Sequence, residues 1–202
     1  EFGGVPLYVH TLSRLKDFEV HVDTDSHKIL DEIYKNPSLR HVKGFERNTS
    51  LLGDDVSVCS LISDFIIQFL VSGPICQVHV TSPFIQPETI RSAISKMDSY
   101  DSVVSCDTIQ ERLWESKKGV MRPINHDPDV LLPTQDLQKM YRENSLFYIF
   151  DADNSRLHIT LDKFFHATSS EVFGDTQNTS MTGIHIPTQL LSSLQKFDCL
   201  RF

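Results

Sequence analysis

Apolar residues recur along the chain with two different periods. The clearest stretch runs from 58 to 69, where apolar side chains return every three or four residues and predict an amphipathic helix: Val58, Leu61, Ile62, Phe65, Ile66 and Phe69. Asp54 or Asp55 can cap the start of this helix, and Gly73-Pro74 can end it. Alternation with a period of two predicts strands elsewhere: Phe18–Asp23, Ile75–Val80, Ser102–Cys106, Leu146–Phe150 and Ile184–Pro187.

Helical patterns lie between these strands. They are predicted at Pro6–Leu15, after a capping Ser26 with Ile29, Leu30 and Ile33, at Pro87–Met97, and at Gln189–Phe197. Repeated strand-then-helix order predicts an α/β fold, with three α/β/α layers and a mainly parallel, Rossmann-like sheet. A length of 202 residues fits one domain with a sizeable core, so we expect a single domain over 1–202.

Two segments do not follow the alternating order. From Ile109 to Tyr141 the pattern thins into Pro, Asn, Asp and Gln, and from Phe164 to Thr182 it is rich in Ser, Thr and Gly. The second segment is predicted to be mostly loop. The first is an excursion long enough to predict a functional loop or a contact with a partner chain.

Composition excludes several classes of function. The hydrophobic fraction is 40%, the charged fraction is 23%, and the net charge is −8. This charge, with no basic cluster beyond Lys117-Lys118, argues against nucleic-acid binding. No apolar run approaches the ~20 residues of a membrane helix, so no membrane partner is expected. The cysteines lack CxxC spacing and suit free thiols in a reducing compartment, which predicts a cytoplasmic protein: Cys59, Cys76, Cys106 and Cys199.

Candidate chemistry lies where strands end. In QVHVTSPF, from Gln77 to Phe84, the strand stops at Thr81-Ser82-Pro83 and leaves hydroxyl groups at the carboxyl edge of the sheet, where α/β folds bind ligands. Asp25 follows another strand, although it can also be an acid favoured by a helix start. His79 can equally be a site residue or a core histidine. Arg47 and Tyr148, taken alone, suit a surface arginine and a core tyrosine.

Several motifs, in this order, resemble segments of the acylneuraminate (CMP-sialic acid synthetase) cytidylyltransferase family. GGVPL resembles the segment after the family's phosphate loop, and VDTDS, from Val22 to Ser26, resembles its VSTDS turn. The other matches are RNTSLLGDD to an Arg-Pro…Leu…Asp segment, VHVTSPF to LQPTSPL, YDSVVS to YDSVFSV, TQDL to RRQD, and YRENSLFYIF to YENGSFYI. Each match alone is weak, and their shared order makes the resemblance specific.

The resemblance implies a nucleotidyltransferase fold and a reaction between CTP and a sialic-acid-like 2-keto sugar acid. CMP would be transferred to the sugar, pyrophosphate would be released, and Mg²⁺ would assist. The implied nucleotide-binding residues are Arg47, Asp25, Asp54 and Ser82. The implied sugar-binding residues are His79, Thr81, Gln135, Asn144 and Tyr148. Asp25 is also the implied metal ligand, no catalytic residue is assigned, and the excursion at 109–141 would reach into a second subunit of a homodimer.

Departures from the family pattern imply an alternative. The family's Gly-rich phosphate loop would precede Gly3. GIHIPTQLL lines up with a metal strand, AIDIDTPEDL, in which His185 and Pro187 replace the two aspartates. Pro133 or Thr134 stands where an arginine would meet the sugar carboxylate. The chain is therefore either an active synthetase or a weakened, inactive relative that binds a nucleotide or sugar or serves as a partner subunit. A third reading, altered metal or sugar preference, depends on His79 and His185.

Overall fold

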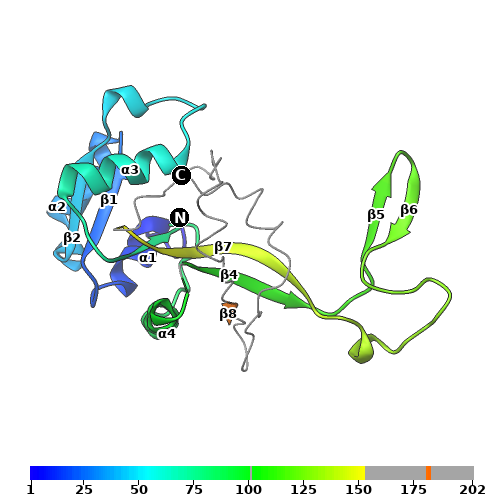
Figure 1. Cartoon of the computed structure of the whole chain (residues 1–202). Coiled ribbons are helices and arrows are strands. Elements are labelled where there is room, and N and C mark those ends of the chain that lie inside the picture. Colours follow the sequence, from blue (N-terminus) through cyan, green and yellow to red (C-terminus); the bar gives the residue numbers. More distant parts are fainter. Residues whose placement is uncertain (101, 153–180, 183–202) are drawn as a thin grey trace.

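The structure is a computed structural model, which describes residues 1–100, 102–152 and 181–182. The α-helices are α1 (Leu7–Arg14), α2 (His27–Lys35), α3 (Val58–Phe69) and α4 (Pro87–Ile94). The strands are β1 (Val20–Thr24), β2 (Val42–Glu46), β3 (Pro74–Val78), β4 (Ser102–Ile109), β5 (Trp114–Lys117), β6 (Val120–Pro123), β7 (Met140–Asp151) and β8 (Met181–Thr182). Short 3₁₀ turns occur at Pro37–Leu39, Thr49–Leu51, Ser95–Asp98 and Thr134–Asp136. Figure 1 shows their arrangement.

β1 and β2 pair in parallel, with Thr24 opposite Glu46 at their carboxyl ends. One face of this pair packs on α1 and α2 through a small core: Val9, Leu12, Ile33, Leu39 and Val42, with Val20, Val22 and Ile29 beside it. The other face packs on α3 through the rings of His21, Phe45, Phe65 and Phe69. α2 lies so close to β2 that a Cβ at Gly44 would stand 2.9 Å from the Leu30 side chain. Helices therefore cover both faces of this parallel pair.

The remaining long strands form a sheet in the order β3-β7-β4-β8. β7 lies between β3 and β4 and runs antiparallel to both, so β3 and β4 share one direction. The mixed α/β class is confirmed, whereas the expectation of a mainly parallel sheet is not met: among the described strands only β1 and β2 pair in parallel. β3 and β4 run in the same direction and are connected through α4, but the chain returns from its excursion as β7 and inserts antiparallel between them, so they do not pair with each other.

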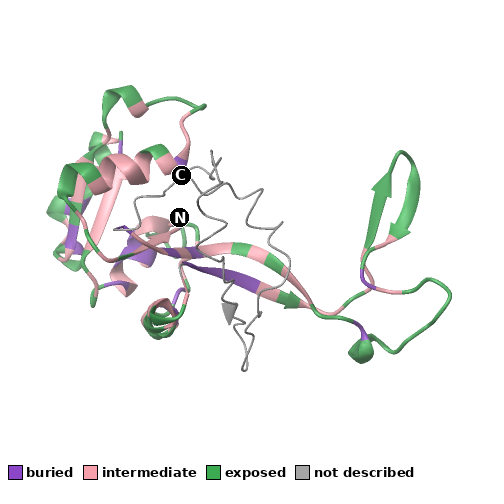
Figure 2. Cartoon of the chain, viewed as in Figure 1, coloured by how far each residue is buried: buried purple, intermediate pink, exposed green. Residues whose placement is uncertain are grey.

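The main core joins the two sheets. Its buried members are Leu15, Ile85, Ile90, Ala93, Val103, Phe147 and Ile149, and Val20 of β1 packs against it as well as against the smaller core. In Figure 2 the buried residues concentrate along β4 and near α1. Burial raises the pKa of the Cys76 thiol to about 12 and that of Cys106 to about 11, as expected for free cysteines in a core.

Helix α3 confirms the strongest periodic signal, with bounds equal to those of the apolar stripe. Its caps differ from those predicted. Ser57 caps the start by accepting a hydrogen bond from the Cys59 N–H, and Asp54 and Asp55 lie further upstream in the preceding turn. At the other end Leu70 takes the left-handed conformation (φ 49°), so the helix ends before Gly73 is reached.

The excursion forms an arm at one end of the molecule. Figure 1 shows the β5–β6 hairpin and the 3₁₀ turn at Thr134–Asp136 apart from the body that holds β1, β2 and the helices. Side-chain to backbone hydrogen bonds stabilise the arm. Asn125, which is buried, accepts from the Leu113 N–H and donates to the Glu111 carbonyl. Gln110 donates to the carbonyls of Gln135 and Leu137.

In the part of the chain that the structure describes, no helix has the length and apolar character needed to cross a bilayer. The predicted loop up to 180, strand at 184–187 and helix at 189–197 lie outside the described residues.

Candidate functional site

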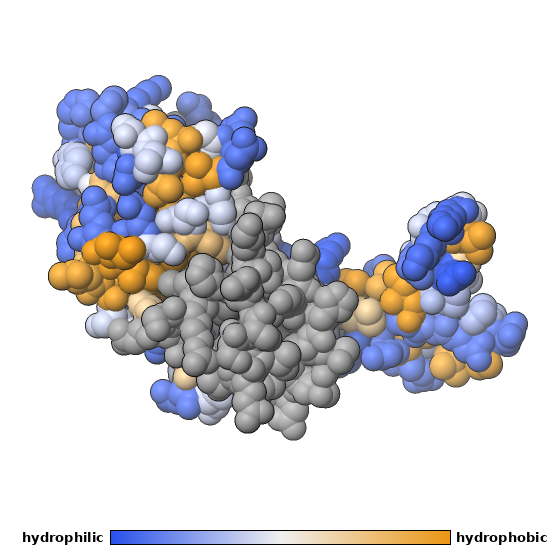
Figure 3. Space-filling model, turned by 45° about the horizontal axis from the view of Figure 1, so that its top comes forward, coloured by the Kyte–Doolittle hydropathy of each residue, from blue (hydrophilic) through white to orange (hydrophobic). Residues whose placement is uncertain are grey.

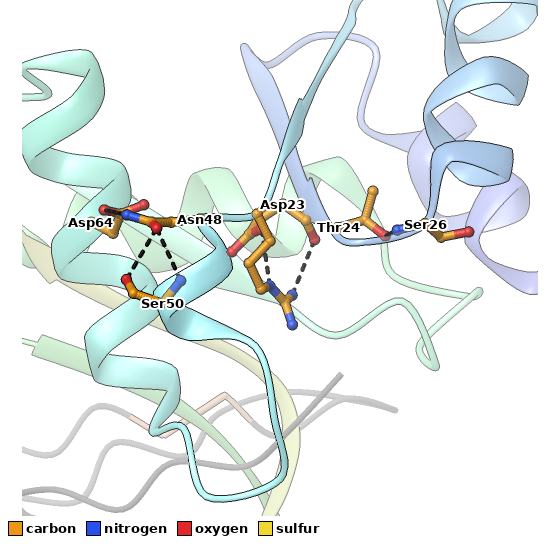
Figure 4. Close-up of polar contacts among 7 residues, drawn as sticks. Asp23, Thr24, Ser26, Asn48, Ser50 and Asp64 are labelled. Carbon is orange, nitrogen blue, oxygen red and sulfur yellow. Dashed lines mark hydrogen bonds and ion pairs between the residues drawn. The ribbon is translucent and has the colours of Figure 1, made fainter.

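The first polar cluster lies at the carboxyl ends of the parallel strands β1 and β2. Arg47 is held there because its backbone N–H donates to the Thr24 carbonyl at 3.0 Å. Its Nε donates to Asp23 Oδ1 at 3.1 Å and its Nη2 to the Asp23 carbonyl at 3.4 Å. The side chains are only 15% exposed for Arg47 and 21% exposed for Asp23. Figure 4 shows Asp23 and Thr24 at this strand end, with Ser26 beyond them.

The charges at this rim are mostly negative. Burial raises the pKa of Asp23, Asp64 and Asp25 raise it further, and the hydrogen bond from Arg47 opposes the rise. Asp64 of α3 also accepts a hydrogen bond from Asn48, while Asp25 is exposed. Nη1 of Arg47 has no hydrogen-bond partner among the described residues, so its two N–H groups can donate to an anionic or carbonyl ligand.

The second cluster lies where β3 ends. The turn predicted there is present, because the Ser82 N–H donates to the His79 carbonyl at 3.1 Å. Thr11 of α1 ties the same turn to the body by donating to the Val80 carbonyl at 2.8 Å. His79 is 8% exposed, and its Nε2 lies 3.4 Å from Gln77 Nε2. Thr81 is exposed, so its hydroxyl can meet a ligand.

A large bulge in β7 brings Tyr148 to this cluster. Between Val104 and Cys106 the β7 partner changes from Tyr148 to Glu143, so one residue of β4 faces several of β7. Ser145 adopts φ 54° within the bulge, and the Tyr148 hydroxyl donates to Glu143 and, at 3.3 Å, to Ser145. The Tyr148 ring lies 6.1 Å from that of His79.

Buried Ser105 holds the bulge in place. Its hydroxyl accepts from the Phe147 N–H at 3.0 Å and donates to the Phe147 carbonyl at 3.2 Å. Asn144 lies on the outer side of the bulge, where it donates to Asp107 at 2.9 Å and accepts from the Leu146 N–H. The bulge therefore places Tyr148 and Asn144 on one short segment with different neighbours.

Electrostatics keep His79 neutral near pH 7. Burial lowers the pKa of His79, and the nearby Glu143 carboxylate opposes this shift only in part. A neutral imidazole has one N–H donor and one acceptor, which suits hydrogen bonds to sugar hydroxyls.

The implied site residues thus fall into groups. His79, Thr81, Ser82 and Tyr148 belong to the cluster at the end of β3, and Arg47 and Asp25 to the rim of β1 and β2. Asp54 is exposed in the turn before α3, and Gln135, with Pro133 and Thr134, is exposed on the arm. The sequence did not indicate Asp23 or Glu143. The two aspartates at the end of β1, Asp23 and Asp25, were a signal for Asp23, but its partner could not be identified without the strand β2.

A sequence profile for a family described as Cytidylyltransferase matches residues 1–197. This chain belongs to the cytidylyltransferase family. By family it is therefore a nucleotidyltransferase, and the coarser part of the sequence-based resemblance is confirmed.

The fold has a solved counterpart. The chain is similar to the crystal structure of 4-diphosphocytidyl-2C-methyl-D-erythritol synthase from Anaerococcus prevotii, with a TM-score of 0.51 and 14% identity. The match covers 85% of this chain and 70% of that one. At this identity the likeness supports the cytidylyltransferase fold. A comparison with curated proteins finds no match.

Proposed function

We propose that this cytidylyltransferase transfers CMP from CTP to a sialic-acid-like 2-keto sugar acid. The anomeric hydroxyl oxygen would form a bond to the α-phosphorus and lose its proton to water. The bond from the α-phosphorus to the bridging oxygen would break, and that oxygen would leave with pyrophosphate. The family match over residues 1–197 is the observation that carries the proposal. The acylneuraminate motifs in the sequence favour this sugar class, and a three-layer, Rossmann-like architecture over a single domain is part of the same proposal.

Arg47 is proposed to bind the nucleotide. Its Nη1 group has free N–H donors at the carboxyl edge of β1 and β2, where α/β folds bind ligands. Asp25 and Ser82 would lie beside the phosphates, and Asp54 would contact the nucleotide from the turn before α3. These roles follow the sequence resemblance.

His79, Thr81, Asn144 and Tyr148 are proposed to bind the sugar. The neutral imidazole of His79, the Tyr148 hydroxyl and the exposed Thr81 hydroxyl provide donors and acceptors within one turn and one bulge. Gln135 lies on the arm and would reach a sugar only in a neighbouring subunit, which is consistent with a homodimer.

Mg²⁺ fits this rim only together with substrate oxygens. No group of three metal-ligating side chains occurs in the described ranges, and His185 and Pro187 lie outside them. Mg²⁺ is commonly held by one or two carboxylates and by substrate phosphates, so Asp25 is the residue that would hold it. When bound there, the ion would neutralise phosphate charge.

The test is release of pyrophosphate from CTP, with N-acetylneuraminate and 3-deoxy-manno-octulosonate as separate acceptors and UTP as the competing nucleotide. We expect release that requires CTP and one sugar acid. Tyr148→Phe should lower the rate with the sugar limiting, whereas Tyr34→Phe, which removes an exposed hydroxyl bonded to the Gly44 carbonyl, should not. No release with any acceptor would favour the alternative, in which the chain is a binding or partner subunit. The ion pair between Arg47 and Asp23 also favours that alternative, because Asp23 already balances the positive charge of Arg47.

The homodimer has its own test. Large apolar side chains are exposed along the arm: Trp114, Val120, Met121, Ile124, Val130, Leu131 and Leu132. Figure 3 shows apolar residues on the surface of this arm. Leu131, at 85% exposed, should be covered by a second copy, so Leu131→Glu should yield monomers in light scattering. The control Ile67→Glu, on α3 and 73% exposed, should leave the dimer intact. A wild-type monomer at micromolar concentration would refute the proposal.

A further inference from the structure

Arg47 is neutralised by its own chain. Two of its three nitrogens donate to Asp23, one to the carboxylate at 3.1 Å and one to the carbonyl at 3.4 Å. Both side chains are mostly buried, at 15% and 21% exposed, so water screens this ion pair only weakly. The guanidinium keeps its positive charge, but the Arg47–Asp23 pair as a whole has no net charge, so its attraction for an anionic ligand is reduced, although Nη1 can still donate hydrogen bonds.

The surroundings do not restore a positive charge. Asp64 and Asp25 both act electrostatically on Asp23, and Glu46, next to Arg47 in sequence, pairs at 3.6 Å with His27, a residue that is charged only when protonated. CTP carries about four negative charges, so binding depends strongly on the local field. As far as the described residues show, the rim offers this polyanion hydrogen-bond donors but no excess of positive charge.

We propose that Asp23 limits the affinity of this rim for polyanionic ligands by compensating Arg47. This inference rests on the proposed nucleotide role of Arg47 and adds to it a residue that determines how much negative charge the site accepts. The acylneuraminate motif that VDTDS resembles has serine at this position, so serine is a natural replacement. With Asp23 uncharged, the guanidinium would act on the ligand with its full charge.

The experiment measures the dissociation constants of CTP and of inorganic pyrophosphate by calorimetry for the full chain. The variants are Asp23→Ser and Asp23→Asn. Asp23→Asn keeps an oxygen acceptor for Arg47 Nε, so the measurement can still be made if the serine variant folds poorly. Asp31→Asn is the matched control, because it changes the net charge equally at an exposed ion pair with Lys35 on α2. Arg47→Gln combined with each Asp23 change completes a double-mutant cycle.

We expect both Asp23 variants to bind CTP about tenfold more tightly than the wild type, as for one added charge beside a polyanion. The gain should shrink as salt is raised, and it should vanish when Arg47 is also replaced. Asp31→Asn should bind as the wild type does.

Other outcomes separate the two proposals. If the wild type binds CTP and the Asp23 variants bind it equally or more weakly, the inference is wrong and the nucleotide role stands. If pyrophosphate binds more tightly to the variants while CTP binds to none, the inference stands and CTP is the wrong nucleotide. If neither ligand binds to any of the proteins, both proposals fail.

Discussion

Two buried serines on β4 should respond in opposite ways to the same substitution. Ser105 and Ser102 are 2% and 6% exposed. The Ser105 hydroxyl bonds to both the N–H and the carbonyl of Phe147, whereas Ser102 Oγ has no hydrogen-bond partner among the described residues. Ser105→Ala would leave two buried backbone groups of Phe147 unpaired. Ser102→Ala would remove an unpaired buried oxygen.

The expected magnitudes follow from these contacts. An unsatisfied buried donor or acceptor costs about 1–3 kcal/mol, and carbonyls tolerate it better than N–H groups, so Ser105→Ala should lower the free energy of unfolding by about 2–4 kcal/mol. Ser102→Ala should change it by about 0 to +1 kcal/mol, because a desolvated hydroxyl gains nothing from burial. For a chain of 202 residues each 1 kcal/mol shifts the Tm by about 2–4 °C.

Urea unfolding followed by far-ultraviolet circular dichroism measures both changes. The midpoint should fall for Ser105→Ala and stay or rise for Ser102→Ala, with equal slopes showing that the exposed surface on unfolding is unchanged. Equal loss of stability in the two variants would refute the reasoning, since it would mean that the volume of the hydroxyl matters and its hydrogen bonds do not. Ser116→Ala, at an exposed position of β5, is the control and should leave the free energy of unfolding nearly unchanged.

Three further changes test local features. Ser145→Gly should raise the free energy of unfolding by about 0.5–1 kcal/mol in urea titrations, because φ 54° suits glycine, and a loss would contradict this. Leu70→Gly, at a residue 87% exposed with φ 49° at the end of α3, should stabilise by a similar amount in thermal melts, and a lower Tm would count against the helix end. The pKa of His79 is lowered by burial, so the folded state binds fewer protons than the unfolded state below the ordinary value of about 6.5. The stabilisation is therefore present above that value and lost as the pH falls through the lowered pKa, and His79→Gln should show a smaller loss of stability between pH 7 and 5 than the wild type. An identical pH profile would exclude this role.

The helices were predictable because their signals are local. In α3 the apolar residues lie on one stripe within a dozen positions, and the structure gives the helix the bounds of that stripe. The N-terminal cap of α3 was harder to predict. Three candidate acceptors precede the helix (Asp54, Asp55 and Ser57), and it is Ser57 that accepts from the Cys59 N–H. The strand β2 was missed because Gly44 interrupts its alternation. That glycine is explained only by the close approach of Leu30 on α2.

The length of β7 could not be predicted for a related reason. The sequence indicated a strand at 146–150, and the structure extends it from Met140 to Asp151 across the bulge. A bulge changes which side chains face the core, so the alternation before Ser145 is out of phase with that after it. The same shift brings Glu143 to the Tyr148 hydroxyl. Glu143 precedes the predicted strand at 146–150, so it was not recognised as part of the site.

The missed strand also explains the missed partner of Arg47. An arginine after an unassigned segment has no neighbours in a sequence-based prediction, and a surface position is then its simplest interpretation. Once β2 pairs in parallel with β1 and Thr24 stands opposite Glu46, the next residue, Arg47, must lie at the strand end that follows Asp23. The register therefore brings the guanidinium of Arg47 close to Asp23, and both side chains are partly buried there. The sequence resemblance implies that this arginine binds a ligand, and the pairing adds that Asp23 balances its charge, which is the basis for the proposal that residue 23 affects the affinity of the site.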